Sequence, residues 1–80
     1  MEIIKKALLR KMLASQIIGG RHTAIENVPK GFPKHLRGDV EKAVKQLIKE
    51  GYIILKPTSY GLQVSLNPRR IKEIREMVEA

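Results

Sequence analysis

The chain of 80 residues contains no cysteine and no tryptophan, and its aromatic residues are Phe32, Tyr52 and Tyr60. Without thiols, neither a disulfide nor a thiolate zinc site can hold the fold together. So few aromatic side chains leave little to build a stacking platform for single-stranded nucleic acid. The sequence has no apolar run near the ~20 residues of a membrane span, and its N-terminus lacks the apolar core of a secretory signal. We therefore expect a cytoplasmic protein without a membrane partner.

What the chain has in excess is positive charge. Lys and Arg number 16 against 8 acidic residues, which gives a formal charge of +8. Such an excess in a small chain is typical of nucleic-acid binding, although merely soluble basic proteins show it too. Apolar residues are 42% of the sequence, which is a globular composition. We predict a single domain over residues 1–80, with a small core because short chains bury only about 60% of their unfolded surface.

Helical periodicity marks the first segment, from Glu2 to Ile18, and Gly19-Gly20 is expected to end that helix. Its apolar residues form two stripes, the first being Ile3, Ile4, Ala7, Leu8, Ala14 and Ile18 and the second Leu9, Leu13 and Ile17. Apolar surface this wide indicates either a helix deep in the core, which we favour, or a helix that also meets a second copy of the chain.

The middle of the chain contains two helix-start signals. Thr23-Ala24-Ile25-Glu26 matches a capping box and predicts a short helix from Ala24 to about Val28, limited by Pro29. Arg21 and His22 just before it could form a one-bridge strand. Gly31-Phe32-Pro33 is expected to be a turn with Phe32 as a core plug, and Pro33 suits the first turn of the next helix.

That third helix is predicted from about Lys34 to Glu50, with Asp39 as an alternative cap and a later start. Its apolar stripe consists of Leu36, Val40, Ala43, Val44, Leu47 and Ile48. Two strands should follow, Tyr52 to Lys56 and Leu62 to Asn67, with Leu62, Val64 and Leu66 inward and Gln63 and Ser65 outward. Asn67-Pro68 predicts the start of a last helix that runs to Ala80.

The run from Asp39 to Ile53 ends its helix with Leu47-Ile48-Lys49-Glu50-Gly51-Tyr52-Ile53. This ending resembles that of the recognition helix in winged helix-turn-helix domains, which are common in archaeal and bacterial transcription regulators. The resemblance implies an α+β fold: a three-helix core, a β-hairpin wing over about 52–67 and a C-terminal helix, with residues 34–50 as the recognition helix. In that family the third helix usually enters the major groove of double-stranded DNA and the hairpin tip touches the backbone or the minor groove.

Carried onto this chain, the resemblance predicts two groups of DNA-binding residues. The first lies on and around the outward side of the third helix, opposite its apolar stripe: Lys34, His35, Arg37, Gly38, Lys42, Lys45, Gln46 and Lys49. The second is the wing tip: Lys56, Thr58, Ser59 and Tyr60. Arg37, Gln46 and Asp39 are the candidates for reading base edges, and few such side chains predict binding that is mostly to phosphates.

Three other interpretations remain open from the sequence. The first is that the outward side of the third helix is only a solvated face, which commonly carries lysines such as Lys42, Lys45 and Lys49. The winged helix could serve as a protein-protein interaction adaptor, or it could bind RNA. A homodimer through the N- and C-terminal helices is a separate hypothesis.

Catalytic or metal-binding chemistry has little support in the sequence. His35 and Asp39 lie one helical turn apart, but two ligands are too few for a metal site. Ser15, Ser59 and Ser65 have no evident base partner. We therefore expect no enzyme activity, no cofactor and no bound metal.

Overall fold

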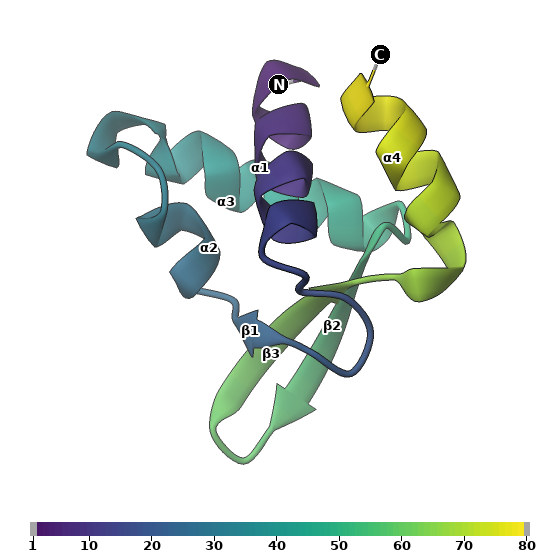
Figure 1. Ribbon diagram of the computed structural model, residues 1–80. Helices are drawn as coiled ribbons and strands as arrows, with labels where there is room; N and C mark the ends of the chain where they lie inside the picture. Colours follow the sequence, from purple (N-terminus) through teal and green to yellow (C-terminus); the bar gives the residue numbers. More distant parts are fainter. Residues whose placement is uncertain (1, 80) are drawn as a thin grey trace.

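The computed structural model describes residues 2–79, which form a small α+β domain of helices packed on an antiparallel sheet (Figure 1). These residues contain four α-helices and three strands, with a 3₁₀ turn before the third and the fourth α-helix. Their order is α1 (Glu2–Ala14), β1 (Thr23–Ala24), α2 (Asn27–Lys30), η1 (Lys34–Leu36), α3 (Arg37–Lys49), β2 (Ile53–Thr58), β3 (Gly61–Leu66), η2 (Pro68–Arg70) and α4 (Ile71–Glu79). None of the helices in this range combines the length and apolar composition that crossing a bilayer requires.

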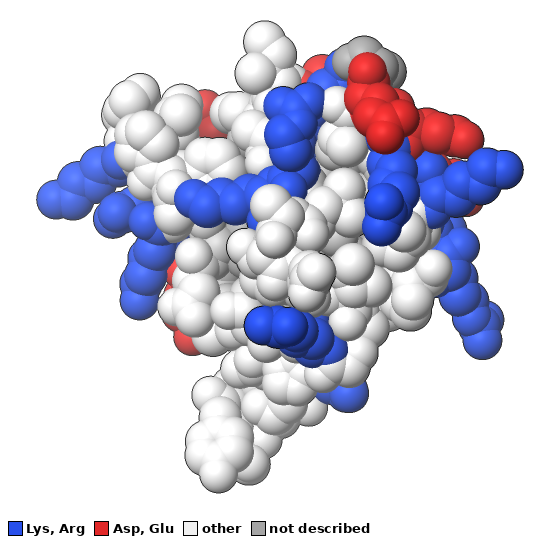
Figure 2. Space-filling model, viewed as in Figure 1, with Lys and Arg blue, Asp and Glu red and all other residues white. Residues whose placement is uncertain are grey.

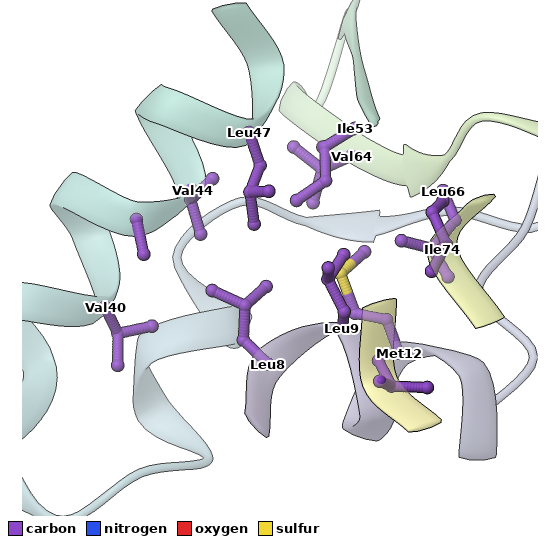
Figure 3. Packing of buried hydrophobic residues seen from close by; sticks show 12 residues of the cluster. Leu8, Leu9, Met12, Val40, Val44, Leu47, Ile53, Val64, Leu66 and Ile74 are labelled. Atoms are coloured by element: carbon purple, nitrogen blue, oxygen red, sulfur yellow. The ribbon is translucent and has the colours of Figure 1, made fainter. Parts of the chain in front are cut away.

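The core lies where α1, α3, α4 and the base of the hairpin meet. Figure 3 shows side chains from these elements converging on one cluster. Its members are Leu8, Leu9, Met12, Val40, Ala43, Val44, Leu47, Ile53, Val64, Leu66, Ile74 and Val78. The stripe predicted on the third helix is therefore confirmed, with Leu36 and Ile48 half-buried at its ends. Burial of such side chains is what makes a fold of this size stable.

The sheet has the strand order β1-β3-β2, so β3 lies in the middle. β2 and β3 form a hairpin in which Ile53 is in register with Leu66 and Thr58 with Gly61. β1 adds two residues to the other side of β3, with Thr23 opposite Val64. Ile18 forms a further parallel bridge to Leu66. The outer edge of β2 has no partner strand among residues 2–79.

α1 is shorter than the sequence predicted. It ends at Ala14, and Gln16 has the left-handed φ of 56° that turns the chain, upstream of Gly19-Gly20. Ile17 and Ile18 then run beside β3, where Leu66 donates its amide to the carbonyl of Ile17 at 2.9 Å. The first predicted stripe is also wrong at Ile3 and Ala14, which are exposed. The buried side of α1 contains Lys5, Leu8, Leu9 and Met12.

The capping box at Thr23 is not formed. Thr23 and Ala24 are the strand β1, which places the expected short strand two residues later than Arg21 and His22. α2 begins at Asn27 and has no side-chain cap. Pro29 lies within its first turn, where the amide that proline lacks would have no helical partner. Phe32 is half-buried against the core, as predicted.

The hairpin departs from the predicted inward and outward sides at two residues. Val64 and Leu66 are fully buried, whereas Leu62 is 44% exposed because the hairpin extends beyond the helices. Ser65, predicted outward, is buried; its strand lies between β2 and the segment around Ile18. The bounds of both strands differ from the predicted ones by one or two residues: β2 is Ile53–Thr58, and β3 is Gly61–Leu66.

Asn67 fixes the start of the last helical segment, as predicted. Its side-chain oxygen accepts from the amide of Arg69 at 3.0 Å, and its Nδ2 donates to the carbonyl of Gly51 at 3.0 Å. Arg70 adds a second link, because its guanidinium stacks 4.3 Å from the Tyr52 ring and donates to the carbonyl of Glu50 at 3.2 Å. These contacts join the segment before α4 to the turn between α3 and β2.

Replacing Asn67 with alanine should lower the free energy of unfolding by about 1–2 kcal/mol, because it removes a helix cap and the hydrogen bond to Gly51. Urea denaturation followed by circular dichroism measures this loss. Asn27→Ala is the matched control, since that exposed amide caps no helix and donates to the Thr23 hydroxyl at 3.3 Å. Equal losses in the two variants would contradict the cap assignment.

Candidate nucleic-acid interface

The outward side of α3 carries a row of three lysines. All three are exposed: Lys42, Lys45 and Lys49. On the same side, Gly38 near the start of α3 and Lys34 and His35 of the preceding η1 are also exposed. The row is a direct result of the buried stripe, because residues opposite Val40, Ala43 and Leu47 on a helix must face solvent. Lys42 and Lys49 are seven residues apart, or about 10 Å along the helix axis. We call Lys42, Lys45 and Lys49 the lysine row.

Acidic side chains flank the lysine row but do not interrupt it. Glu41 lies on the side of α3 that faces α2, since it lines a groove with Ile25 and Pro29 of the α2 region. Asp39 and Glu50 lie on the opposite flank, where Glu50 forms an ion pair with Lys5 of α1 at 3.2 Å. The strip of α3 surface that contains the lysine row itself carries only lysines and Gly38.

Two of the candidate base-reading side chains are engaged inside the molecule. Arg37 is half-buried, and its Nε donates to the carbonyl of Phe32 at 3.4 Å. Gln46 donates from Nε2 to the Glu50 carboxylate at 3.3 Å. Asp39, the third candidate, is exposed. Arg37 and Gln46 would have to give up these contacts to read a base edge, which favours contacts with phosphates over contacts with bases.

Gly38 lies in open space on this surface. A methyl group added at its Cα would meet no atom within 4 Å, so neither packing nor backbone strain requires a glycine there. A glycine costs helix stability, and one that the fold does not require is explained if a ligand comes close to the backbone.

The wing tip is closed by hydrogen bonds within its loop and is uncharged apart from Lys56. Ser59 and Tyr60 form the two-residue loop, and Gly61 has a φ of 115° that few other residues adopt. The Thr58 hydroxyl donates to the carbonyl of Gly61 at 2.8 Å and accepts from the amide of Tyr60 at 3.2 Å. Tyr60 is 93% exposed. These bonds within the loop hold Tyr60 at the projecting end of the hairpin (Figure 1).

Positive side chains are not confined to α3. Figure 2 shows Lys and Arg spread over the face that carries α1 and α4, while acidic side chains gather near the C-terminal end of α4. None of these basic residues is among the binding residues predicted from the sequence. Some have structural partners: Arg10 donates to the carbonyl of Val78 at 2.6 Å, and Lys11 to that of Gly31 at 2.6 Å. Contacts between such distant residues leave no signal in the sequence.

His35 and Asp39 gain no third ligand. Among residues 2–79, no three of His, Asp and Glu come together in a way that could hold a metal ion.

Comparison of the chain with protein-family models, with curated proteins and with solved structures gave no match.

Gly38→Ala should raise the free energy of unfolding by up to about 1 kcal/mol, because alanine is the better helix former and has room there. Thermal and urea denaturation measure the gain. Gly61→Ala is the control and should destabilise the chain, since its backbone has the left-handed φ that disfavours a side chain. A loss of stability in Gly38→Ala would show that the site is not open.

The Glu50 carboxyl provides a test of the Gln46 contact. The hydrogen bond from Gln46, followed by that from Lys5, lowers its pKa below the ordinary value of 4.5. Because the pKa of Glu50 is lower in the folded chain, these contacts stabilise the fold above about pH 4.5. The stabilisation is lost as the pH falls through the folded pKa.

Gln46→Ala should therefore raise the pKa of Glu50 toward 4.5, as measured by NMR titration of the side-chain carboxyl. Lys42→Ala, on the same helix but without a contact to Glu50, should leave that titration unchanged. An unmoved pKa in Gln46→Ala would mean that Gln46 is free to contact a ligand.

Proposed function

We propose that this chain is a winged helix-turn-helix domain that binds double-stranded DNA with the outward side of α3. The observation that carries the proposal is the lysine row, uninterrupted by acidic side chains and held outward by the buried stripe on the other side of the helix. Three exposed ammonium groups on a rigid helix can neutralise phosphates and release their counterions, which favours binding to a polyanion.

The arrangement of the elements supports the same proposal. α2, the turn at Phe32 and α3 form the helix-turn-helix segment, and the β2–β3 hairpin projects beyond the helices as the wing (Figure 1). The +8 formal charge would draw the domain toward DNA from a distance. A role in transcription regulation is the biological setting that we propose for this binding.

Binding of this kind is expected to be mostly to the DNA backbone. Arg37 and Gln46 are engaged within the domain, so base contacts are few. If Lys34 contacts a phosphate as well as the lysine row, four phosphate contacts predict a salt slope near −3.6. That slope is a loss of about 150-fold in affinity between 50 and 200 mM salt. Gly38→Ala would weaken this binding if the helix backbone approaches a phosphate at that residue.

A second candidate is a protein-interaction adaptor. Its support is a groove of about 190 Å³ between α2 and α3, whose apolar lining is Ile25, Pro29 and Val44. The charged side chains that line it are Glu26, Glu41 and Lys45, so acidic groups are in excess. A basic peptide with an apolar anchor would fit this chemistry, whereas DNA would not. Titrations against duplex DNA, single-stranded DNA and structured RNA at low salt separate this candidate and RNA binding from the proposal.

Lys42→Ala with Lys45→Ala should weaken duplex binding about equally for all sequences and reduce the magnitude of the salt slope by about 2, because two phosphate contacts are lost. Fluorescence anisotropy over a range of salt concentrations measures both quantities. The matched control is Lys72→Ala with Arg75→Ala, which removes the same charge from exposed positions on α4. Equal effects of the two double variants would show that binding follows net charge and does not use α3.

A further inference from the structure

The outer edge of β2 is an open strand edge. The order β1-β3-β2 places this strand at the side of the sheet, and among residues 2–79 no segment pairs with its outer side. Because Thr58 and Gly61 close the two-residue hairpin loop, Thr58, Lys56 and Ile54 direct their backbone groups at β3. Ile53, Leu55 and Pro57 therefore direct theirs outward. An edge of this kind can pair with another strand.

Three apolar side chains are exposed beside this edge. Leu55 is 37% exposed and Ile54 is 40% exposed, and they lie on opposite faces of the strand. Leu62 of β3, in register with Pro57, is 44% exposed on the same face as Leu55. Lys56 is the only charged residue of β2. The surface has the apolar character of a protein contact and lacks the charge that contact with a polyanion needs.

We propose that two copies of the chain associate by antiparallel pairing of their β2 strands. The strand is complementary to itself when Leu55 of one copy lies opposite Leu55 of the other. Ile53 then lies opposite Pro57, and Ile54 opposite Lys56, so apolar residues meet on one face and the two Lys56 ammonium groups are kept apart. The amide that Pro57 lacks falls near the ends of the paired segment, where a missing hydrogen bond is least disruptive.

The pairing makes one continuous six-stranded sheet with its two-fold axis perpendicular to the sheet. Both helical layers then lie on the same side, and neither Ser59 nor Tyr60 at the wing tip takes part in the pairing.

A contact limited to six residues per strand is smaller than a standard interface, so association is expected to be weak and dependent on concentration. Two copies of charge +8 repel each other, and added salt should strengthen the dimer by screening that repulsion.

Sedimentation equilibrium of the full chain at low and high salt, over micromolar to millimolar concentrations, tests the proposal. The expected result is a monomer–dimer equilibrium that shifts toward dimer with salt. Leu55→Lys should weaken the dimer at least about tenfold, because it places two like charges directly opposite each other. Its side chain is partly exposed in the monomer, and circular dichroism would verify that the variant folds.

Ile3→Lys is the matched control. Ile3 is 84% exposed on α1, far along the chain from β2, and a dimer through the terminal helices would be disrupted by this change instead. Amide exchange gives an independent readout: the Leu55 amide should become protected at high concentration, whereas those of Ile54 and Lys56, which bond to β3, should be protected throughout.

A chain that stays monomeric at all concentrations, or a dimer that Leu55→Lys leaves intact and Ile3→Lys disrupts, would overturn the proposal. DNA binding is tested separately, because it weakens with salt and depends on Lys42 and Lys45. Failure of either proposal therefore leaves the other standing.

Discussion

The contact between the apolar sides of α1 and α3 determines how the rest of the molecule is arranged. Leu8 and Leu9 of α1 are fully buried, as are Val40, Ala43 and Leu47 of α3. Turning α3 about its axis would remove these side chains from the core and bury lysines in their place, at a large cost in desolvation. The outward direction of the lysine row is therefore a consequence of hydrophobic packing, and no separate interaction is needed to hold it.

Around this contact, the two ends of the hairpin have different environments. At its base, Ile53 and Leu66 belong to the core, and Asn67 and Arg70 tie the start of the last helical segment to the turn after α3. At its far end, the strands continue beyond the helices and expose apolar side chains. The same hairpin thus contributes to stability at one end and offers contact surface at the other, which is an economical use of a short chain.

How much the sequence could predict depended on whether a signal was local. The stripe of α3 and the Asn67-Pro68 cap were identified correctly because periodicity and capping act within a few residues. Ile17 and Ile18 continued the apolar pattern of α1, but a bridge to β3 takes them out of the helix. Thr23 had the sequence of a cap and became a strand for the same reason. Exposure of the lysine row followed from the stripe, whereas the engagement of Arg37 and Gln46 depends on tertiary contacts that no spacing reveals.

The central position of β3 also determines when the sheet can form during synthesis. β1 and Ile18 both find their partners about 40 or more positions later in the sequence. Pairing between strands so far apart in the sequence is slow compared with forming the local contacts of a helix or a hairpin. On the ribosome, α1 and β1 emerge before β3, the strand with which β1 pairs. Leu8, Leu9 and Met12 therefore cannot be covered by the complete sheet until residue 66 has also emerged. Chaperone contact during translation would be concentrated in that interval.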